Sequence, residues 1–212
     1  MKLKKSVKKF IIRACILVLV IILGIVGYKM YKGKDSEKKP VKEVKVINQI
    51  EKYGYSLKEN KPTKYKEYFK ELEAVLNEKE VDEEKYVSKL SEMFIYDFYS
   101  LNDKTAKTDI GGVEFVYQPI LDNFLQNAQN TYYKYIESNI YNNRKQSLPI
   151  VTNIAIESVN KGPFAYGDKT DENAYAVVVN WDYTDSAFSG YQKKATLIWV
   201  HDDIKFSLVE LQ

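Results

Sequence analysis

The chain has 212 residues, a formal net charge of +3 and a single cysteine, Cys15. Residues 1–13 contribute +6 and residues 29–45 contribute +4, which leaves −7 for residues 46–212. This acidic balance argues against nucleic-acid binding by the large C-terminal part. Because that part contains no cysteine, it can form neither disulfides nor thiolate metal sites. Its length suits one domain with a hydrophobic core rather than two.

A nearly continuous apolar run, residues 10–28, follows a short basic tail, residues 1–9. As a helix this run would be ~28 Å long, enough to cross the hydrocarbon core of a bilayer. No Ala-x-Ala-like cleavage site follows it, so a retained transmembrane anchor in contact with lipid is favoured over a cleaved signal peptide. The short basic tail predicts a cytoplasmic N-terminus, and residues 29–45 form a Lys-rich linker to an extracytoplasmic domain, residues 46–212.

The spacing of apolar residues predicts three amphipathic helices between Thr63 and Ile136, after a mixed pattern over residues 46–57 that fits a short helix or a strand. Thr63 is the expected N-cap of the first helix and Asp82 that of the second, while Pro119 suits the first turn of the third. The apolar stripes are Tyr65, Tyr68, Phe69, Leu72, Val75 and Leu76, then Val87, Leu90, Phe94, Phe98 and Leu101, then Leu121, Phe124, Leu125, Ala128, Tyr132, Tyr135 and Ile136.

After Arg144 the apolar period changes from 3.6 to 2, which indicates β-strands. The alternation covers residues 150–157, 175–183, 195–200 and 204–208. Asp202 and Asp203 predict a tight turn between the last two strands. Helices followed by an antiparallel meander of at least four strands predict an α+β fold in which about three helices pack on the sheet.

The order of a membrane anchor, helices and a C-terminal meander resembles the nuclear-transport-factor-2-like (cystatin-like) cone fold. The closing hairpin, Thr196 to Leu208, is similar to the last two strands of that superfamily. In layout and length the chain resembles the assembly-factor family of type IV secretion and conjugation machines. That resemblance implies a cone-fold domain outside the membrane that has no enzymatic activity, self-associates and docks other components of the machine.

A second likeness concerns one segment and the source of the chain. Residues 97–104, with residues 109–112 after them, look like blocks in uncharacterised anchored proteins of low-GC bacteria. The chain has thirty lysines and two arginines, a bias toward AT-rich codons that agrees with a Gram-positive bacterium of this kind. This likeness implies no function.

Asp97 is a polar residue on the apolar stripe of the second predicted helix, in line with Leu90, Phe94 and Leu101. A carboxylate at such a position lies either at the end of the stripe or buried and paired. It could contact a ligand inside the cone, or it could accept hydrogen bonds from backbone amides of residues 102–112. The second interpretation is favoured.

His201 is the only histidine. Asp202 and Asp203 adjoin it, but neighbouring residues of a strand point to opposite faces, so the three side chains are not expected to converge. A place at the surface or rim is therefore favoured over catalysis for His201.

The tyrosines divide by helical position. Tyr132 and Tyr135 are predicted to be core residues, whereas Tyr96, Tyr99 and Tyr133 are predicted to be exposed. Tyr96 and Tyr99 flank Asp97 and are candidates for ligand binding, and Tyr133 is a candidate for a protein interface.

The sequence leaves three functions open. The favoured one is a non-enzymatic scaffold that docks membrane or envelope proteins and can form homo-oligomers. The second is a ligand-binding or sensory domain with Asp97 in its cavity, together with Tyr96, Tyr99 and His201 as ligand-binding candidates. The third is an anchored hydrolase or isomerase, which needs a second polar residue close to Asp97 or His201. The sequence contains no catalytic or cofactor motif, so no catalytic residue, cofactor or metal is predicted.

Overall fold

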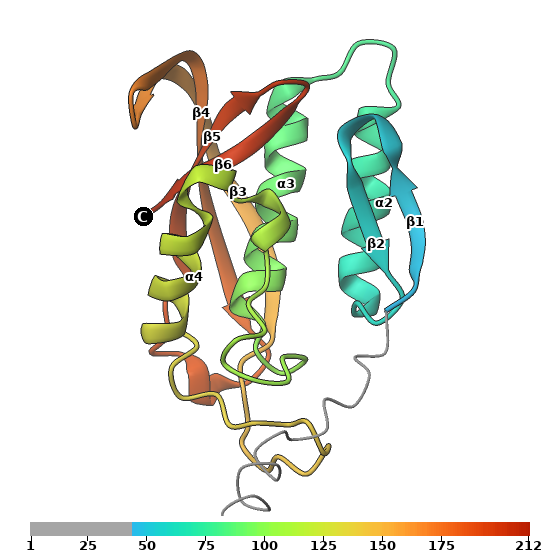
Figure 1. Ribbon diagram of the computed structural model, residues 1–212, viewed down its shortest axis with the longest axis vertical. Helices are drawn as coiled ribbons and strands as arrows, with labels where there is room; N and C mark the ends of the chain where they lie inside the picture. Colours follow the sequence, from blue (N-terminus) through green and yellow to red (C-terminus); the bar gives the residue numbers. More distant parts are fainter. Residues whose placement is uncertain (1–43) are drawn as a thin grey trace, which may run out of the picture. The chain divides into compact units, whose positions relative to one another are not determined.

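The computed structural model describes residues 44–212. In this part of the chain three α-helices combine with a four-stranded antiparallel sheet, so the fold is α+β as predicted (Figure 1). The predicted tail (residues 1–9), the predicted membrane segment (residues 10–28) and the linker up to residue 43 lie outside the described residues. No helix within residues 44–212 is both long and apolar enough to cross a bilayer.

Two helices, α2 (Thr63–Leu76) and α3 (Glu83–Tyr99), pack against each other. Every predicted stripe position of these two helices is buried, which confirms both amphipathic patterns. Asp82 caps α3 as predicted, because its side chain accepts a hydrogen bond from a backbone N–H of the first turn at 3.1 Å. At α2 the prediction was wrong by one position: Thr63 is the first helical residue, and Pro62 occupies the N-cap without a side-chain hydrogen bond.

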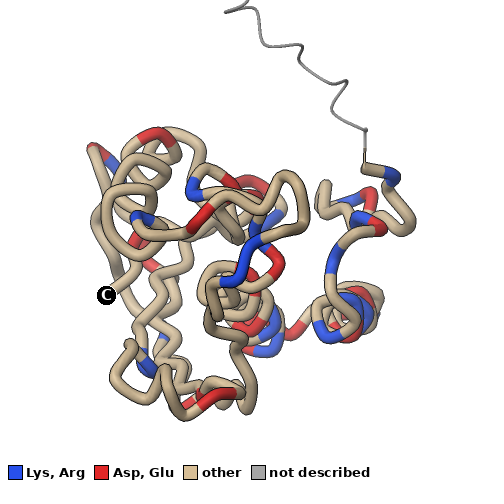
Figure 2. The backbone as a smooth tube through the Cα atoms, turned by 90° about the horizontal axis from the view of Figure 1, so that it is seen from below, with Lys and Arg blue, Asp and Glu red and all other residues tan. Residues whose placement is uncertain are grey.

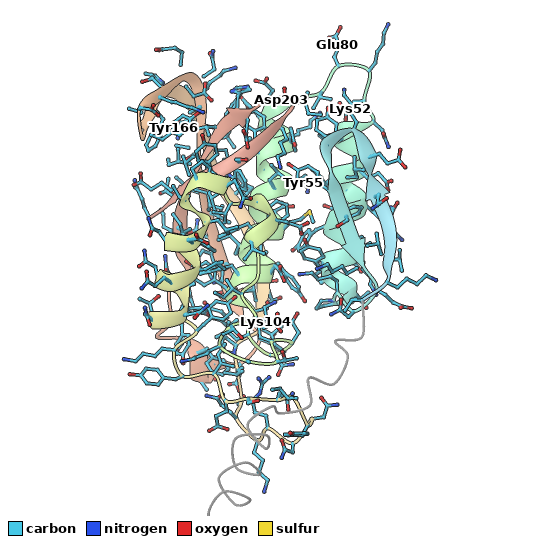
Figure 3. All side chains as sticks on the ribbon, viewed as in Figure 1. Lys52, Tyr55, Glu80, Lys104, Tyr166 and Asp203 are labelled. Atoms are coloured by element: carbon cyan, nitrogen blue, oxygen red, sulfur yellow. The ribbon has the colours of Figure 1, made fainter. Side chains whose placement is uncertain are left out.

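The residues of mixed pattern form a hairpin of two strands, β1 (Val46–Ile50) and β2 (Tyr55–Lys58), which pair antiparallel. A single 3-10 turn joins them, followed by Gly54 at a φ of +73°, a conformation that glycine adopts without strain. Tyr55 points from β2 toward α3 (Figure 3), where its hydroxyl lies 2.7 Å from that of Tyr86. The hairpin and the two helices therefore share one core.

The four strands of the main sheet follow each other in chain order and are all antiparallel. They are β3 (Val151–Tyr166), β4 (Lys169–Tyr183), β5 (Lys194–Asp202) and β6 (Lys205–Leu211). Helix α3 packs on β3 and β4. These two strands extend well beyond the predicted segments, and Gly167, with a φ of +58°, lies in the two-residue turn between them. The predicted turn after β5 is shifted by one residue, to Asp203 and Ile204.

The third helix, α4 (Leu121–Asn130), is shorter than predicted. Pro119 lies in a 3-10 turn just before it, and the chain leaves the helix at Thr131. The N–H of Tyr133 then bonds to a carbonyl five residues earlier at 3.0 Å, which turns the following side chains out of helical register. As a result, the predictions for two tyrosines were wrong: Tyr133 is fully buried and Tyr135 is 75% exposed.

Charge is unevenly divided among the helices. Helices α2 and α3 carry side chains of both signs, whereas α4 carries a single charged residue, Asp122 (Figure 2). The outer face of α4 is therefore polar but nearly uncharged.

Tyr133→Phe should lower the free energy of unfolding by ~1–3 kcal/mol, the cost of leaving buried polar groups unpaired. The Tyr133 hydroxyl donates a hydrogen bond to the carbonyl of Phe98 (2.6 Å) and accepts one from the N–H of Gly111 (3.1 Å). The control Tyr135→Phe should change stability little, because that side chain is exposed. Urea denaturation of both variants is the measurement, and equal losses would contradict the inward turn of Tyr133.

Candidate functional site

Asp97 lies near the C-terminal end of α3 and is only 4% exposed. Its carboxylate accepts hydrogen bonds from the ammonium groups of Lys61 (2.6 Å) and Lys104 (2.9 Å) and from the N–H of Gly112 (2.8 Å). Three donors, two of them cationic, offset the cost of burying the charge. Asp97 thus accepts from an amide in the loop of residues 101–112, together with two lysines that the sequence did not identify as its partners.

The lysines determine the ionisation of Asp97. Burial alone would raise the pKa of Asp97, but the charges of Lys104 and Lys61 outweigh this effect and lower the pKa to about 2. Burial would lower the pKa of Lys104, yet the carboxylates of Asp97 and Asp103 raise it instead. Lys104 lies below the end of α3 in Figure 3. The opposite pKa shifts of Asp97 and Lys104 keep both charged at neutral pH.

Two glycines allow the loop of residues 101–112 to approach α3. A Cβ atom on Gly111 would stand 2.0 Å from the carbonyl oxygen of Asp97, which leaves no room for any side chain. Gly112 has a φ of +72°, and a Cβ there would meet the ring of Phe94 at 2.6 Å. The glycines and the carboxylate together fasten the loop to the helix.

Tyr96 and Tyr99, predicted as exposed ligand candidates, are both buried. The reason is that α3 is covered by α2 on one side and by the sheet on another, so residues outside its main stripe are also internal. The ring of Tyr96 packs against Tyr68 of α2, with centroids 5.9 Å apart, and the ring of Tyr99 packs against Trp181 of β4 at 4.5 Å.

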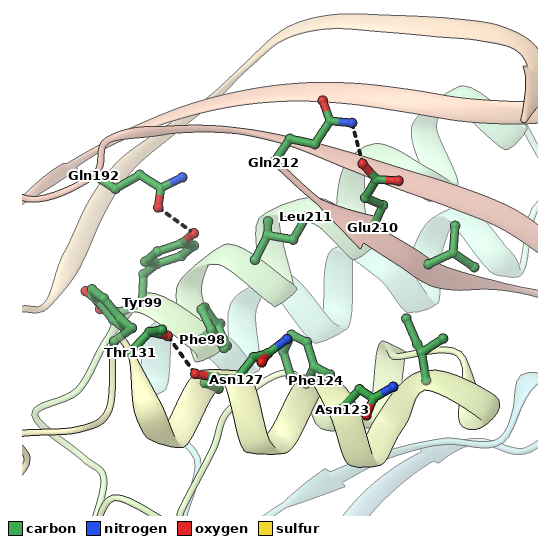
Figure 4. A pocket seen from close by; sticks show the side chains of 14 residues that line it. Phe98, Tyr99, Asn123, Phe124, Asn127, Thr131, Gln192, Glu210, Leu211 and Gln212 are labelled. Atoms are coloured by element: carbon green, nitrogen blue, oxygen red, sulfur yellow. Dashed lines mark hydrogen bonds between the residues drawn. The ribbon is translucent and has the colours of Figure 1, made fainter. Parts of the chain in front are cut away.

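A groove of about 500 Å³ lies between α4, the end of α3 and the end of β6 (Figure 4). It is lined by Phe98, Tyr99, Ile120, Asn123, Phe124, Asn127, Ala128, Thr131, Tyr132, Gln192, Val209, Glu210, Leu211 and Gln212. Asp97 is not among these residues, so the groove does not place that carboxylate at the base of a cavity. Of the predicted candidates, Tyr99 does line it, and its hydroxyl donates a hydrogen bond to the side-chain carbonyl of Gln192 at 3.1 Å.

The lining combines aromatic rings with amide side chains. Glu210 is the only acidic side chain among the residues that line the groove, and it accepts a hydrogen bond from the Gln212 side-chain amide at 2.6 Å. Aromatic surface with a few directional polar groups is typical of sites for uncharged ligands and extended peptides. The groove therefore suits a neutral, partly apolar occupant rather than a highly charged one.

One wall of the groove is a strand edge. β6 is the last strand of the sheet, and β5 is its neighbour in the strand order β3-β4-β5-β6. Gln212 exchanges both of its backbone hydrogen bonds with Thr196 of β5, so the N–H and C=O of its neighbour Leu211 point away from β5. Farther back on the same side, the Leu208 carbonyl accepts a hydrogen bond from the N–H of Tyr117 at 2.9 Å. One position of this edge is therefore already paired within the chain, because Val116 forms a parallel bridge with Leu208.

His201 does not line the groove and is partly exposed near the end of β5. Its Nδ1 lies 2.9 Å from a carboxylate oxygen of Asp171, and its Nε2 lies 3.3 Å from one of Glu83. The adjacent Asp202 instead accepts from the hydroxyl of Ser207 at 2.7 Å. Two carboxylates, from β4 and the start of α3, therefore flank the ring. In the described part of the chain, no group of three or more His, Cys, Asp or Glu side chains is placed to hold a metal ion.

The groove itself was missed at the sequence level, although a signal was present. Asn123, Asn127 and Thr131 recur every four residues and give α4 an uncharged polar stripe beside its apolar one. A helix face that lacks charge in a chain with 29% charged residues differs from an ordinary solvated face.

Asp97→Asn should destabilise the protein by ~3–5 kcal/mol, because removing one member of a buried ion pair leaves the partner charge uncompensated. The matched control is Asp182→Asn, whose partner Lys193 is 3.3 Å away in an exposed pair. That variant should lose less than ~1 kcal/mol. Chemical denaturation measures both, and a loss at Asp97 no larger than that at Asp182 would contradict the buried cluster.

The stabilisation by Asp97 should also depend on pH. A carboxyl group whose pKa is lower in the folded state stabilises the fold above its unfolded pKa and loses this effect as pH falls through its folded pKa. Stability should therefore fall more steeply in the unmodified protein than in Asp97→Asn between the unfolded value of about 3.9 and the folded value of about 2. If the stability of the two proteins fell equally with pH, a group other than Asp97 would be responsible for the loss.

No family model, no curated protein and no solved structure matches this chain. What the protein does is therefore inferred from its own residues.

Proposed function

We propose that this protein is a non-enzymatic docking module, anchored in the cell membrane by residues 10–28, with its folded domain outside. The domain would bind an extended, largely uncharged segment of a membrane or envelope protein in the groove between α4 and β6. The observation that carries this proposal is the free backbone edge of Leu211 along an aromatic groove. Strand addition at such an edge draws affinity from main-chain hydrogen bonds and specificity from neighbouring pockets.

The arrangement of the bound segment follows from the contacts at the edge. Val116 forms a single parallel bridge with Leu208. The backbone edge of β6 from Val209 onward is one wall of the groove. A partner strand would continue along this edge and place alternate side chains between β6 and α4. Phe98 and Phe124 line the groove and offer apolar contact to those side chains, while Asn123 and Asn127 offer hydrogen bonds.

The resemblance to the cone fold and to type IV secretion assembly factors supports the same proposal. The coarse layout of helices on a C-terminal antiparallel sheet agrees with a cone-like domain. In such a domain, a groove beside the last strand would serve for docking machine components or a second copy of the chain.

A second candidate function is the binding of a small ligand. It is favoured by the volume of the groove, about 500 Å³, which lies in the range of small-molecule sites. The Tyr99 hydroxyl and the Gln192 amide would give such a ligand its polar contacts. In this function Tyr99 would be the polar group in the cavity, a role that the sequence had suggested for Asp97.

An anchored hydrolase or isomerase ranks third. His201 with Asp171 and Glu83 supplies the converging polar groups that this function requires. The lining of the groove contains neither this histidine nor its carboxylates, so the one histidine and the groove do not form a joint site.

Photo-crosslinking of the full-length protein in its native membranes tests the docking proposal. With a photoreactive phenylalanine in place of Asn123, we expect a discrete adduct with a membrane or envelope protein. Adding Asn127→Trp, which fills the groove, should abolish this adduct because the partner segment can no longer enter the groove.

Gln126→Trp is the matched control, since Gln126 is an exposed residue of the same helix that does not line the groove. It should leave the adduct intact. An adduct that survives Asn127→Trp would exclude the groove as the docking site. Absence of any adduct would favour the small ligand, and an adduct between two copies of the chain would assign the groove to self-association.

A further inference from the structure

The segment that follows α4 exposes the three most exposed large hydrophobic side chains of the described residues. Tyr135 is 75% exposed, Ile140 69% and Tyr141 78%. Large apolar groups gathered on one surface segment generally mark an interaction site. We call Tyr135–Tyr141 the apolar loop.

The apolar loop is held in place by hydrogen bonds rather than left loose. The Arg144 guanidinium, three residues after the apolar loop, donates hydrogen bonds to the carbonyls of Lys104 (2.7 Å) and Asn102 (2.8 Å). These bonds connect the segment after α4 to the loop of residues 101–112. The Gln146 side chain donates to the carbonyl of Tyr135 and accepts from the N–H of Glu137, both at 2.9 Å. These bonds fix the backbone of the segment, while the side chains of Tyr135, Ile140 and Tyr141 are exposed to solvent.

Buried residues before, within and after the apolar loop fix its orientation. Tyr133 and Ile136 lie in the core on one side, and Leu148 lies in the core on the other. The outward side chains are thus a stable feature of this surface, and no described residue covers them.

The charge of the surrounding segment differs from that of the domain. Residues 131–150 contain Lys134, Arg144 and Lys145 against one acid, Glu137, whereas residues 46–212 together carry −7. Lys134 and Lys145 are exposed, and the Lys134 ammonium lies 5.1 Å from the centre of the Tyr135 ring. Tyrosine rings with lysines beside them are typical of side chains that settle at the headgroup level of a bilayer.

The position of the loop agrees with a membrane surface. In Figure 1 the segment after α4 lies toward the lower end of the domain, and β1, the first described strand, begins at the lower end of its hairpin. Only fifteen residues, 29–43, separate Val44 from the apolar run that we propose as the anchor. Fully extended, they span at most ~50–54 Å, so the tether keeps the domain close to the bilayer.

We propose that the apolar loop is a second membrane contact, which inserts Tyr135, Ile140 and Tyr141 among the headgroups of an anionic bilayer. Lys134 and Lys145 bind the lipid phosphates beside it. The proposal rests on the proposed membrane anchor, which supplies the proximity, and not on occupation of the groove.

The test uses the full chain in vesicles of phosphatidylcholine and phosphatidylglycerol that contain lipids with a fluorescence quencher at the headgroup level. A Cys15→Ala background allows an environment-sensitive dye to be attached to Ile140→Cys. The control label is Ile204→Cys, an exposed residue of the β5–β6 turn, next to Asp203 at the upper end in Figure 3. We expect several-fold stronger quenching at position 140 than at position 204.

Replacing both Tyr135 and Tyr141 by serine should reduce the quenching at position 140, and so should vesicles of phosphatidylcholine alone. Asn127→Trp should leave it unchanged, which separates this contact from docking in the groove. Equal, weak quenching at positions 140 and 204 would overturn the proposal. A protein that does not associate with the vesicles at all would overturn the anchor as well, whereas loss of groove docking alone would leave the membrane contact standing.

Discussion

The buried carboxylate of Asp97 is the constraint on which the arrangement of the C-terminal half depends. It joins α3 to Lys61 before α2, to Lys104 and to the N–H of Gly112. Gly111, held in the same loop, donates to the Tyr133 hydroxyl, and the carbonyl of Lys104 accepts from Arg144. The loop that this ionised group holds against α3 is thus also bonded to the segment that follows α4.

A buried ion cluster is not an efficient way to gain stability, because the desolvation of each charge offsets much of the attraction between them. An apolar residue at Asp97 would fill the stripe of α3, yet it could not bind two lysines and an amide at once. We infer that Asp97 serves specificity: it allows one position of the loop of residues 101–112 against α3. The close approach of Gly111, which tolerates no Cβ, has the same effect from the other side.

Local sequence patterns were sufficient to predict the features that depend on neighbours close in the chain. The stripes of α2 and α3, the Asp82 cap and the strand alternation depend on neighbours within a few residues, and they were predicted correctly. The failures have a non-local cause. Tyr133 is buried because its hydroxyl binds Phe98 and Gly111, which are far away in sequence, and Tyr96 and Tyr99 are buried because α3 is enclosed by other elements. The groove forms because the end of β6 lies beside α4, and a helical projection of the sequence cannot indicate that contact.

The end of α4 connects the two proposed surfaces. Asn127 and Thr131 line the groove near the last turn of the helix, and the apolar loop begins four residues later, at Tyr135. A helix of ten residues is only ~15 Å long, so a loop at the bilayer would hold the groove close to the headgroups. At this height a segment of a protein that is itself in or against the membrane would reach the groove more readily than a segment of a protein away from the bilayer. The membrane contact would thereby restrict the partners of the groove, before any side chain of β6 or α4 selects among them.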